Sequence, residues 1–145
     1  MSEHPPKRYI RHLGMLKPLD QLIDTTGLDD KQLVQAVSRF YWQSTKSIVA
    51  ERIGHFQKQL GVKPRAIRNE RTYEFWGKCS GGREITFNSL LSLLSPELID
   101  YIVVHELYHI HHMNHDRSFW RRVGSIIPDY KNLDKQLESE GSGSF

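Results

Sequence analysis

Residues 96–115 read PELIDYIVVHELYHIHHMNH, and this stretch decides the interpretation of the chain. It contains His105 and His109, four residues apart, with Glu106 directly after the first histidine. On a helix with 3.6 residues per turn, side chains at positions i and i+4 lie on the same face. Two imidazoles can therefore bind one metal ion, and Glu106, about 100° further round the helix, can reach a water molecule on that ion. This H-E-x-x-H spacing is typical of a zinc site.

Apolar residues surround the motif on the same expected helix. Ser95 is a suitable N-cap and Pro96 a suitable first residue, so we expect a helix from Pro96 to about Met113. Its apolar positions cover well over half of the circumference, which is typical of a helix buried in a domain. These positions are Leu98, Ile99, Ile102, Val103, Leu107 and Ile110. Buried imidazoles and a buried carboxylate are costly without partners, and a metal ion with bound water would satisfy them.

A third metal ligand must come from beyond the second histidine. On a straight helix His112 would lie about 10 Å along the axis from His105, which is too far for one ion with Zn–N bonds of about 2 Å. His111 points away from the side that carries His105. His115 would be about 15 Å away if the helix continued, so it can bind the same ion only if the chain turns back.

The residues next to His115 favour such a turn. Asn114 tolerates the left-handed backbone conformation that often ends a helix. Asp116 is a suitable N-cap for a following helix. We therefore favour His115 as the third ligand. The competing ligands are the acidic residues Asp129 and Asp134, which come from later in the chain.

This constellation predicts a zinc-dependent peptidase or amide hydrolase that acts on a peptide or protein substrate. Zinc with three protein ligands and one open position makes a bound water nucleophilic at neutral pH. Glu106 is the candidate general base, which takes a proton from that water and later delivers one to the leaving amine. The oxyanion that forms often needs a second electrophilic group. The sequence does not separate the nearby candidates for that role, which are Tyr101, Tyr108, His111 and His112.

We divide the chain into an N-terminal arm (residues 1–28), a domain (29–140) and a flexible tail (141–145). Pro and Gly residues interrupt the arm, so it is expected to be irregular apart from a helical turn near residues 19–23 and to pack on the domain. The tail, Gly-Ser-Gly-Ser-Phe, has no apolar pattern that would order it.

The domain is expected to be α+β, with helices packed on a small antiparallel sheet. A long helix should begin after Asp29 or Asp30 and end at Gly61, and its polar centre, residues 43–47, is a point where it can bend or break. The other helices are expected at about 116–127 and 130–138, and the strands at 65–70, 72–78 and 84–88, with a turn at 80–82.

The bulk composition fits a soluble protein. The 145 residues have a net charge of +3 and are 38% hydrophobic and 26% charged, a balance typical of one globular domain with its own core. The most apolar stretch, residues 90–104, contains several polar residues, so no membrane span is expected. The N-terminal residues lack the apolar region of a secretory signal, and the single Cys79 cannot form an internal disulfide, so we expect a cytoplasmic protein.

Several short runs of the chain resemble the YgjP-like metallopeptidase family. They are Trp76–Ser80, Ile85–Asn88, Asp100–His109, Asn114–His115 and Phe119–Trp120. The resemblance covers about residues 39–124. It implies a compact zincin-like fold with helices around a small sheet and the zinc helix at the base of a cleft. It also implies peptide hydrolysis, with His105, His109 and His115 as zinc ligands and Glu106 as the catalytic acid and base.

Two alternative functions remain at the level of the sequence. One is a non-catalytic domain stabilised by structural zinc, although such sites usually have four protein ligands, often cysteines, and Cys79 is the only cysteine. The other is a DNA-associated protein-processing factor. Its support is weak, because no recognition motif accompanies the basic residues.

The sequence does not indicate an oligomeric state. We also expect residues 85–88 to form an edge strand that pairs with the substrate backbone.

Overall fold

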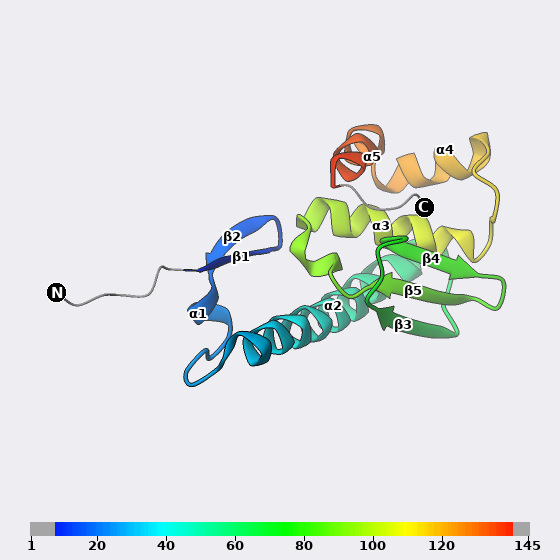
Figure 1. Cartoon of the computed structure of the whole chain (residues 1–145). Coiled ribbons are helices and arrows are strands. Elements are labelled where there is room, and N and C mark those ends of the chain that lie inside the picture. The colour runs from blue at the N-terminus through cyan, green and yellow to red at the C-terminus, as the bar shows by residue number, and fades with distance from the viewer. Residues whose placement is uncertain (1–7, 141–145) are drawn as a thin grey trace.

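The long helix α2 (Asp30–Leu60) and the shorter helix α3 (Pro96–His109) form the centre of the structure, a computed structural model that describes residues 8–140 (Figure 1). The predicted ends of α2 are confirmed. Asp29 caps it, because its carboxylate accepts from the Gln32 amide at 2.8 Å while its own amide donates to the Gln32 side chain at 3.0 Å. Gly61 ends it in the left-handed conformation, with φ of 65°.

The polar centre of α2 does not break the helix. Thr45 is fully buried there, and its hydroxyl donates to the Ser89 carbonyl at 2.7 Å. The Ser92 amide donates back to the Thr45 hydroxyl at 3.1 Å. These bonds connect α2 to the segment that precedes α3, so the polar residue is used for tertiary contact and leaves the helix continuous.

Helix α3 is buried, as predicted, but it ends earlier. Ser95 caps it by accepting from the Leu98 amide at 3.3 Å, and Ile102 and Val103 are fully buried. Helix α3 lies between α2 on one side and α4 (Arg117–Ile126) and α5 (Tyr130–Ser139) on the other (Figure 1). The helix stops at His109 rather than near Met113, and this early end determines where the following residues lie.

The sheet is mixed rather than antiparallel, which corrects one prediction. It consists of β3 (Ala66–Glu70), β4 (Gly77–Ser80) and β5 (Glu84–Asn88) in the order β3-β5-β4. Strand β5 pairs antiparallel with β4 but parallel with β3. The segment 71–76 crosses the sheet without forming a strand, so β4 begins only at Gly77. Because β5 is the central strand, the prediction that residues 85–88 form a free edge is also wrong. The α+β class is confirmed.

Asn88 holds the crossing segment in place. Its side-chain amide donates to the carbonyls of Thr72 at 3.0 Å and Phe75 at 3.1 Å, and its side-chain oxygen accepts from the Leu90 amide at 3.0 Å. Asn88 is only 2% exposed. Buried backbone groups need such partners, so this one side chain fixes the path that brings β4 to the far side of β5.

The described part of the N-terminal arm is more ordered than expected. Strands β1 (Tyr9–His12) and β2 (Met15–Pro18) form an antiparallel hairpin, followed by the expected helical turn α1 (Leu19–Leu22). The turn contains Leu13 with φ of 52°. Leucine rarely adopts this conformation, so the local signal for the turn is limited to Gly14, which has φ of 81°. The Leu13 and Gly14 amides donate to carbonyls of Ser92 and Leu93, so the hairpin packs on the segment before α3.

Residues 1–7 of the arm and the tail predicted for residues 141–145 lie outside the described residues. Within the described part, no helix combines the length and the apolar character that crossing a membrane requires.

Helix α4 begins where predicted, because the Asp116 carboxylate accepts from the Phe119 amide at 3.1 Å.

Replacement of Asn88 with alanine should destabilise the fold. The change leaves two carbonyls and one amide without their partner, so we expect the free energy of unfolding to fall by about 2–4 kcal/mol, measured by urea denaturation. Asn132→Ala is the control, because Asn132 lies exposed and bonds only to Asp129 among the side-chain contacts of the described residues. It should change stability by less than about 0.5 kcal/mol. Equal effects of the two substitutions would contradict the role of Asn88.

Candidate metal centre

Three imidazoles converge at the end of α3. His105 and His109 come from α3, and His115 comes from the loop before α4. The Nε2 atom of His115 lies 2.8 Å from Nε2 of His109 and 3.1 Å from Nε2 of His105. A tetrahedral zinc ion with Zn–N bonds of about 2 Å places its ligand nitrogens about 3.3 Å apart. The cluster therefore has close to the dimensions of a metal site.

The early end of α3 brings His115 back to the helix. The amides of Ile110, His111 and His112 bond to carbonyls of Leu107 and Tyr108, which makes a tight right-handed turn. Asn114 is not left-handed, because Leu13 and Arg83 are the non-glycine residues with positive φ among residues 8–140. The chain thus turns back as predicted, but the prediction that Asn114 provides a left-handed turn is wrong.

Contacts on the far side of two rings place their N–H groups at Nδ1, so the Nε2 atoms of His105 and His109 are acceptors that can bind a cation. His109 donates from Nδ1 to the His112 carbonyl at 3.0 Å. His105 has Nδ1 at 3.1 Å from Oε2 of Glu106, and burial lowers the pKa of His105 to about 3, so its ring is neutral. A neutral imidazole carries one N–H, and His105 and His109 hold theirs at Nδ1, so two acceptor nitrogens converge on Nε2 of His115. A cation would satisfy the converging lone pairs, so the residues present fit a bound metal.

Aromatic side chains fix the orientation of the rings. Phe119 on α4 is fully buried, and its ring centroid lies 5.1, 4.6 and 5.0 Å from those of His105, His109 and His115. Trp120 stacks on His115 with an interplanar angle of 25°. Outer groups that restrict ligand movement stabilise metal sites, so the start of α4 supports the imidazoles as well as following them.

Glu106 lies beside the cluster and is 2% exposed. Burial raises the pKa of its carboxyl to about 7, although the nearby His109 and His115 oppose this shift. Glu106, His109 and His115 line a cleft of about 380 Å³ between β4 and the loop after α3. A carboxyl group with a pKa near neutrality can both accept and donate a proton.

Strand β4 passes directly against Glu106, and Gly77 makes this possible. A Cβ atom on Gly77 would lie 2.8 Å from Cγ and 3.2 Å from Oε2 of Glu106, closer than the side chain allows. Gly77 also lines the cleft. The spacing and chemistry of individual residues in the sequence do not single out this glycine. The one signal for it is its place in the Trp76–Ser80 run that resembles the family.

The residues considered for oxyanion stabilisation point elsewhere. Tyr101 donates from its hydroxyl to Asp134 at 3.0 Å, and Tyr108 stacks against His112. His111 contacts the Gly61 carbonyl at 3.1 Å and His112 contacts Asp116 at 2.8 Å. Within residues 8–140, none of the four lines the cleft.

The acidic competitors for the third ligand position do not join the cluster. Asp134 accepts from Tyr101 and Asp129 accepts from Asn132, and the histidine cluster includes neither. Cys79 does line the cleft, but burial, reinforced by the charge of Glu106, raises the pKa of its thiol to about 11. It is therefore protonated at neutral pH, whereas metal binding requires the thiolate.

Comparison with known proteins agrees with this geometry. Residues 10–140 match the model of the YgjP-like metallopeptidase domain. The chain belongs to this family. Its fold is similar to the crystal structure of the metallopeptidase zymogen abylysin from Pyrococcus abyssi, with a TM-score of 0.61 and 23% sequence identity over 67% of this chain and 99% of that one. The comparison with curated proteins found no match.

Membership of the family makes this chain a metallopeptidase, a hydrolase of peptide bonds that depends on a metal ion. Among residues 8–140, the cluster of His105, His109 and His115 is the group of side chains that could bind such an ion. Family membership therefore argues against the non-catalytic alternative.

Replacement of Gly77 with alanine should displace Glu106 without removing any imidazole. We expect kcat/KM for peptide hydrolysis to fall about 100-fold, while the metal content of the purified protein stays unchanged. The matched control is Gly81→Ala in the adjacent turn, where an added Cβ meets nothing within 4 Å. Wild-type activity in the Gly77 variant would show that β4 does not position the carboxylate.

Proposed function

We propose that the chain is a zinc-dependent peptidase in which His105, His109 and His115 bind the ion and Glu106 is the general base. The observation that supports this most strongly is the convergence of three Nε2 atoms beside a buried carboxylate, at a cleft that Glu106, His109 and His115 line. Three imidazole ligands with an open side favour catalytic zinc over calcium or magnesium, which prefer oxygen ligands. The open side distinguishes the site from structural zinc sites, which are closed by four protein ligands.

In the proposed reaction, the zinc ion and the residues of the chain have different roles. When bound, zinc would activate a water molecule and polarise the carbonyl of the substrate. Glu106 would accept a proton from the attacking water at its carboxylate and deliver it to the leaving amine. Burial raises the pKa of Glu106 to about 7, and a bound cation would lower it, which would favour the ionised form that the base requires. Phe119 is fully buried and its ring lies against all three imidazoles, so an apolar side chain covers that side of the cluster.

Strand β4 is the element best placed to bind the substrate backbone. It is an edge strand, because it pairs with β5 on one side and with no other strand of residues 8–140. Gly77, Lys78 and Cys79 of this strand line the cleft together with Glu106. An extended peptide added along β4 would use main-chain hydrogen bonds, which do not depend on the sequence of the substrate. We therefore propose peptide or protein segments in extended form as substrates.

The role of a DNA-associated factor has no structural support. Several basic residues are used within the protein, since Arg11 pairs with Glu140 at 2.6 Å and Arg52 pairs with Asp100 at 2.7 Å. The free Cys79 is consistent with a reducing compartment such as the cytoplasm, which we propose as the location.

Glu106→Gln tests the proposed mechanism. The amide keeps the shape of the side chain but cannot act as a base, so kcat should fall by about 10²–10⁴-fold while one zinc ion per chain remains bound. Glu74→Gln is the control, because Glu74 also lines the cleft but is exposed, and it should retain kcat within about tenfold. Turnover that survives in the Glu106 variant, with zinc bound, would exclude Glu106 as the base.

A further inference from the structure

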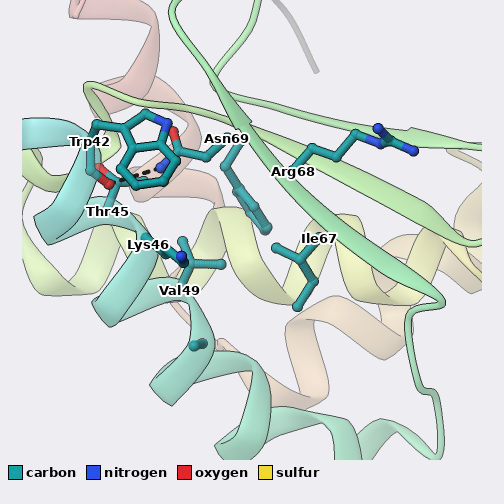
Figure 2. A pocket seen from close by; sticks show the side chains of 9 residues that line it. Trp42, Thr45, Lys46, Val49, Ile67, Arg68 and Asn69 are labelled. Carbon is teal, nitrogen blue, oxygen red and sulfur yellow. Dashed lines mark hydrogen bonds between the residues drawn. The ribbon is translucent and has the colours of Figure 1, made fainter. Parts of the chain in front are cut away.

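A second cavity lies between α2 and β3, and it shares no lining residue with the metal cleft (Figure 2). Its volume is about 370 Å³. Val49 and Phe87 form a buried apolar floor, at 2% and 1% exposure. Trp42 and Ile67 lie at its mouth, and they are among the exposed large apolar residues of the described chain, at 37% and 45%. The size and character of this cavity are those of a binding pocket.

Two donors in this cavity are already used within the protein, whereas Oδ1 of Asn69 is buried without a hydrogen-bond partner among the described residues. Thr45 donates its hydroxyl to the Ser89 carbonyl at 2.7 Å, and Asn69 donates its amide to the Trp42 carbonyl at 2.9 Å. The second of these bonds connects β3 to α2, as the dashed line in Figure 2 shows. The surface that remains for a ligand is therefore mainly apolar.

The charged residues that line the cavity are both basic. Lys46 lies with its Nζ 5.2 Å from the centre of the Trp42 ring, and it is exposed without an ion pair among the described residues. Arg68 has 62% of its side chain exposed and only a 3.4 Å contact with Glu84, which binds Arg65 more closely at 2.9 Å. A ligand at this cavity should therefore carry negative charge next to an apolar group.

Strand β3 supplies the third feature, because it is the other edge of the sheet. It pairs with β5 on one side and with no strand of residues 8–140 on the other. In a parallel pair, part of the N–H and C=O groups of an edge strand point away from its partner. Such groups can bind an added strand, and soluble proteins usually protect them when no partner exists. Arg68 and Glu70 are exposed charged residues on this strand, and Ile67 is an exposed apolar residue between α2 and the edge.

We propose that β3 and this cavity form a docking site for an extended acidic segment of another polypeptide. The segment would add to the sheet along β3, insert one apolar side chain between α2 and β3, and place its carboxylates near Lys46 and Arg68. Strands β3 and β4 are opposite edges of one sheet, so a protein docked at β3 leaves the metal cleft open. This inference does not depend on the proposed mechanism of hydrolysis.

A peptide titration tests the proposal. The probe is a capped six-residue peptide with valine and leucine at the two central positions and glutamate at the other four, added to the ¹⁵N-labelled full chain. We expect amide shifts in residues 66–70 and at the Trp42 indole, with Kd below about 1 mM. A peptide with lysine in place of glutamate, and one with serine in place of the two apolar residues, should each bind at least about tenfold more weakly. Mass spectrometry afterwards verifies that the probe is intact.

Two substitutions assign the binding to this site. Ile67→Asp and Lys46→Glu should each weaken binding of the acidic peptide at least about tenfold, and Lys46→Glu should strengthen binding of the lysine peptide. Both residues are exposed, so neither change should unfold the chain. The control is Val34→Asp, because Val34 is an exposed apolar residue on the same helix that does not line the cavity. It should leave the affinity unchanged.

Four outcomes would overturn the proposal. The first is a set of shifts confined to the metal cleft, and the second is equal affinity for the acidic and lysine peptides. The third is binding of octanoate without binding of the peptide, which would indicate a small-molecule pocket. The fourth is self-association of the free chain in sedimentation velocity that Ile67→Asp abolishes, which would make the occupant a second copy of the chain.

Discussion

The convergence of three imidazoles at the end of α3 is the interaction on which the proposed function depends. Two of them follow from helical spacing, but the third comes from the loop after the helix, which ends at His109. The hydrogen bond from Nδ1 of His109 to the His112 carbonyl links the turn after the helix to the orientation of a ligand ring. This bond stabilises the turn. It also places the hydrogen of the His109 ring at Nδ1, so Nε2 can act as a metal ligand.

Burial of the site explains why so many neighbouring residues are constrained. The Glu106 carboxyl and the imidazoles of His105 and His109 are buried and lose hydration, which shifts their pKa values toward the neutral forms. The fold compensates with close contacts: β4 passes over Glu106 at Gly77, and Phe119 touches each imidazole. Asn88, remote from the cluster, contributes by setting the path of the segment that leads to β4. The sheet is therefore part of the site, although none of its side chains is among the proposed ligands.

Features that depend on local chemistry could be predicted from the sequence. The caps at Asp29, Ser95 and Asp116 each satisfy amides within three residues, and the glycine end of α2 is equally local. His115 could be predicted as the third ligand in two steps. A continuous helix would place His112 too far from His105, and a chain that turns back can return His115 to the site. The structure brings together the three histidines that this reasoning selected.

Features that depend on distant pairing could not be predicted. Alternation of side chains identifies a strand but not its neighbour, so the parallel pairing of β3 with β5 had no local signal. The β1–β2 hairpin depends on a strained Leu13, which is stabilised by contact with Ser92 from far along the chain. The role of Gly77 is visible only once β4 lies against α3, because the constraint is the space that a missing side chain leaves.

The most direct test of the proposed site is zinc stoichiometry in the purified chain and in two histidine variants, measured by elemental analysis and by competition with a chelator. The wild type should bind one zinc ion, and His115→Ala should bind it at least about 100-fold more weakly. His112→Ala should bind as the wild type does, because the His112 carbonyl that bonds to His109 remains. Full zinc affinity in the His115 variant would contradict the central claim that these three imidazoles form one site.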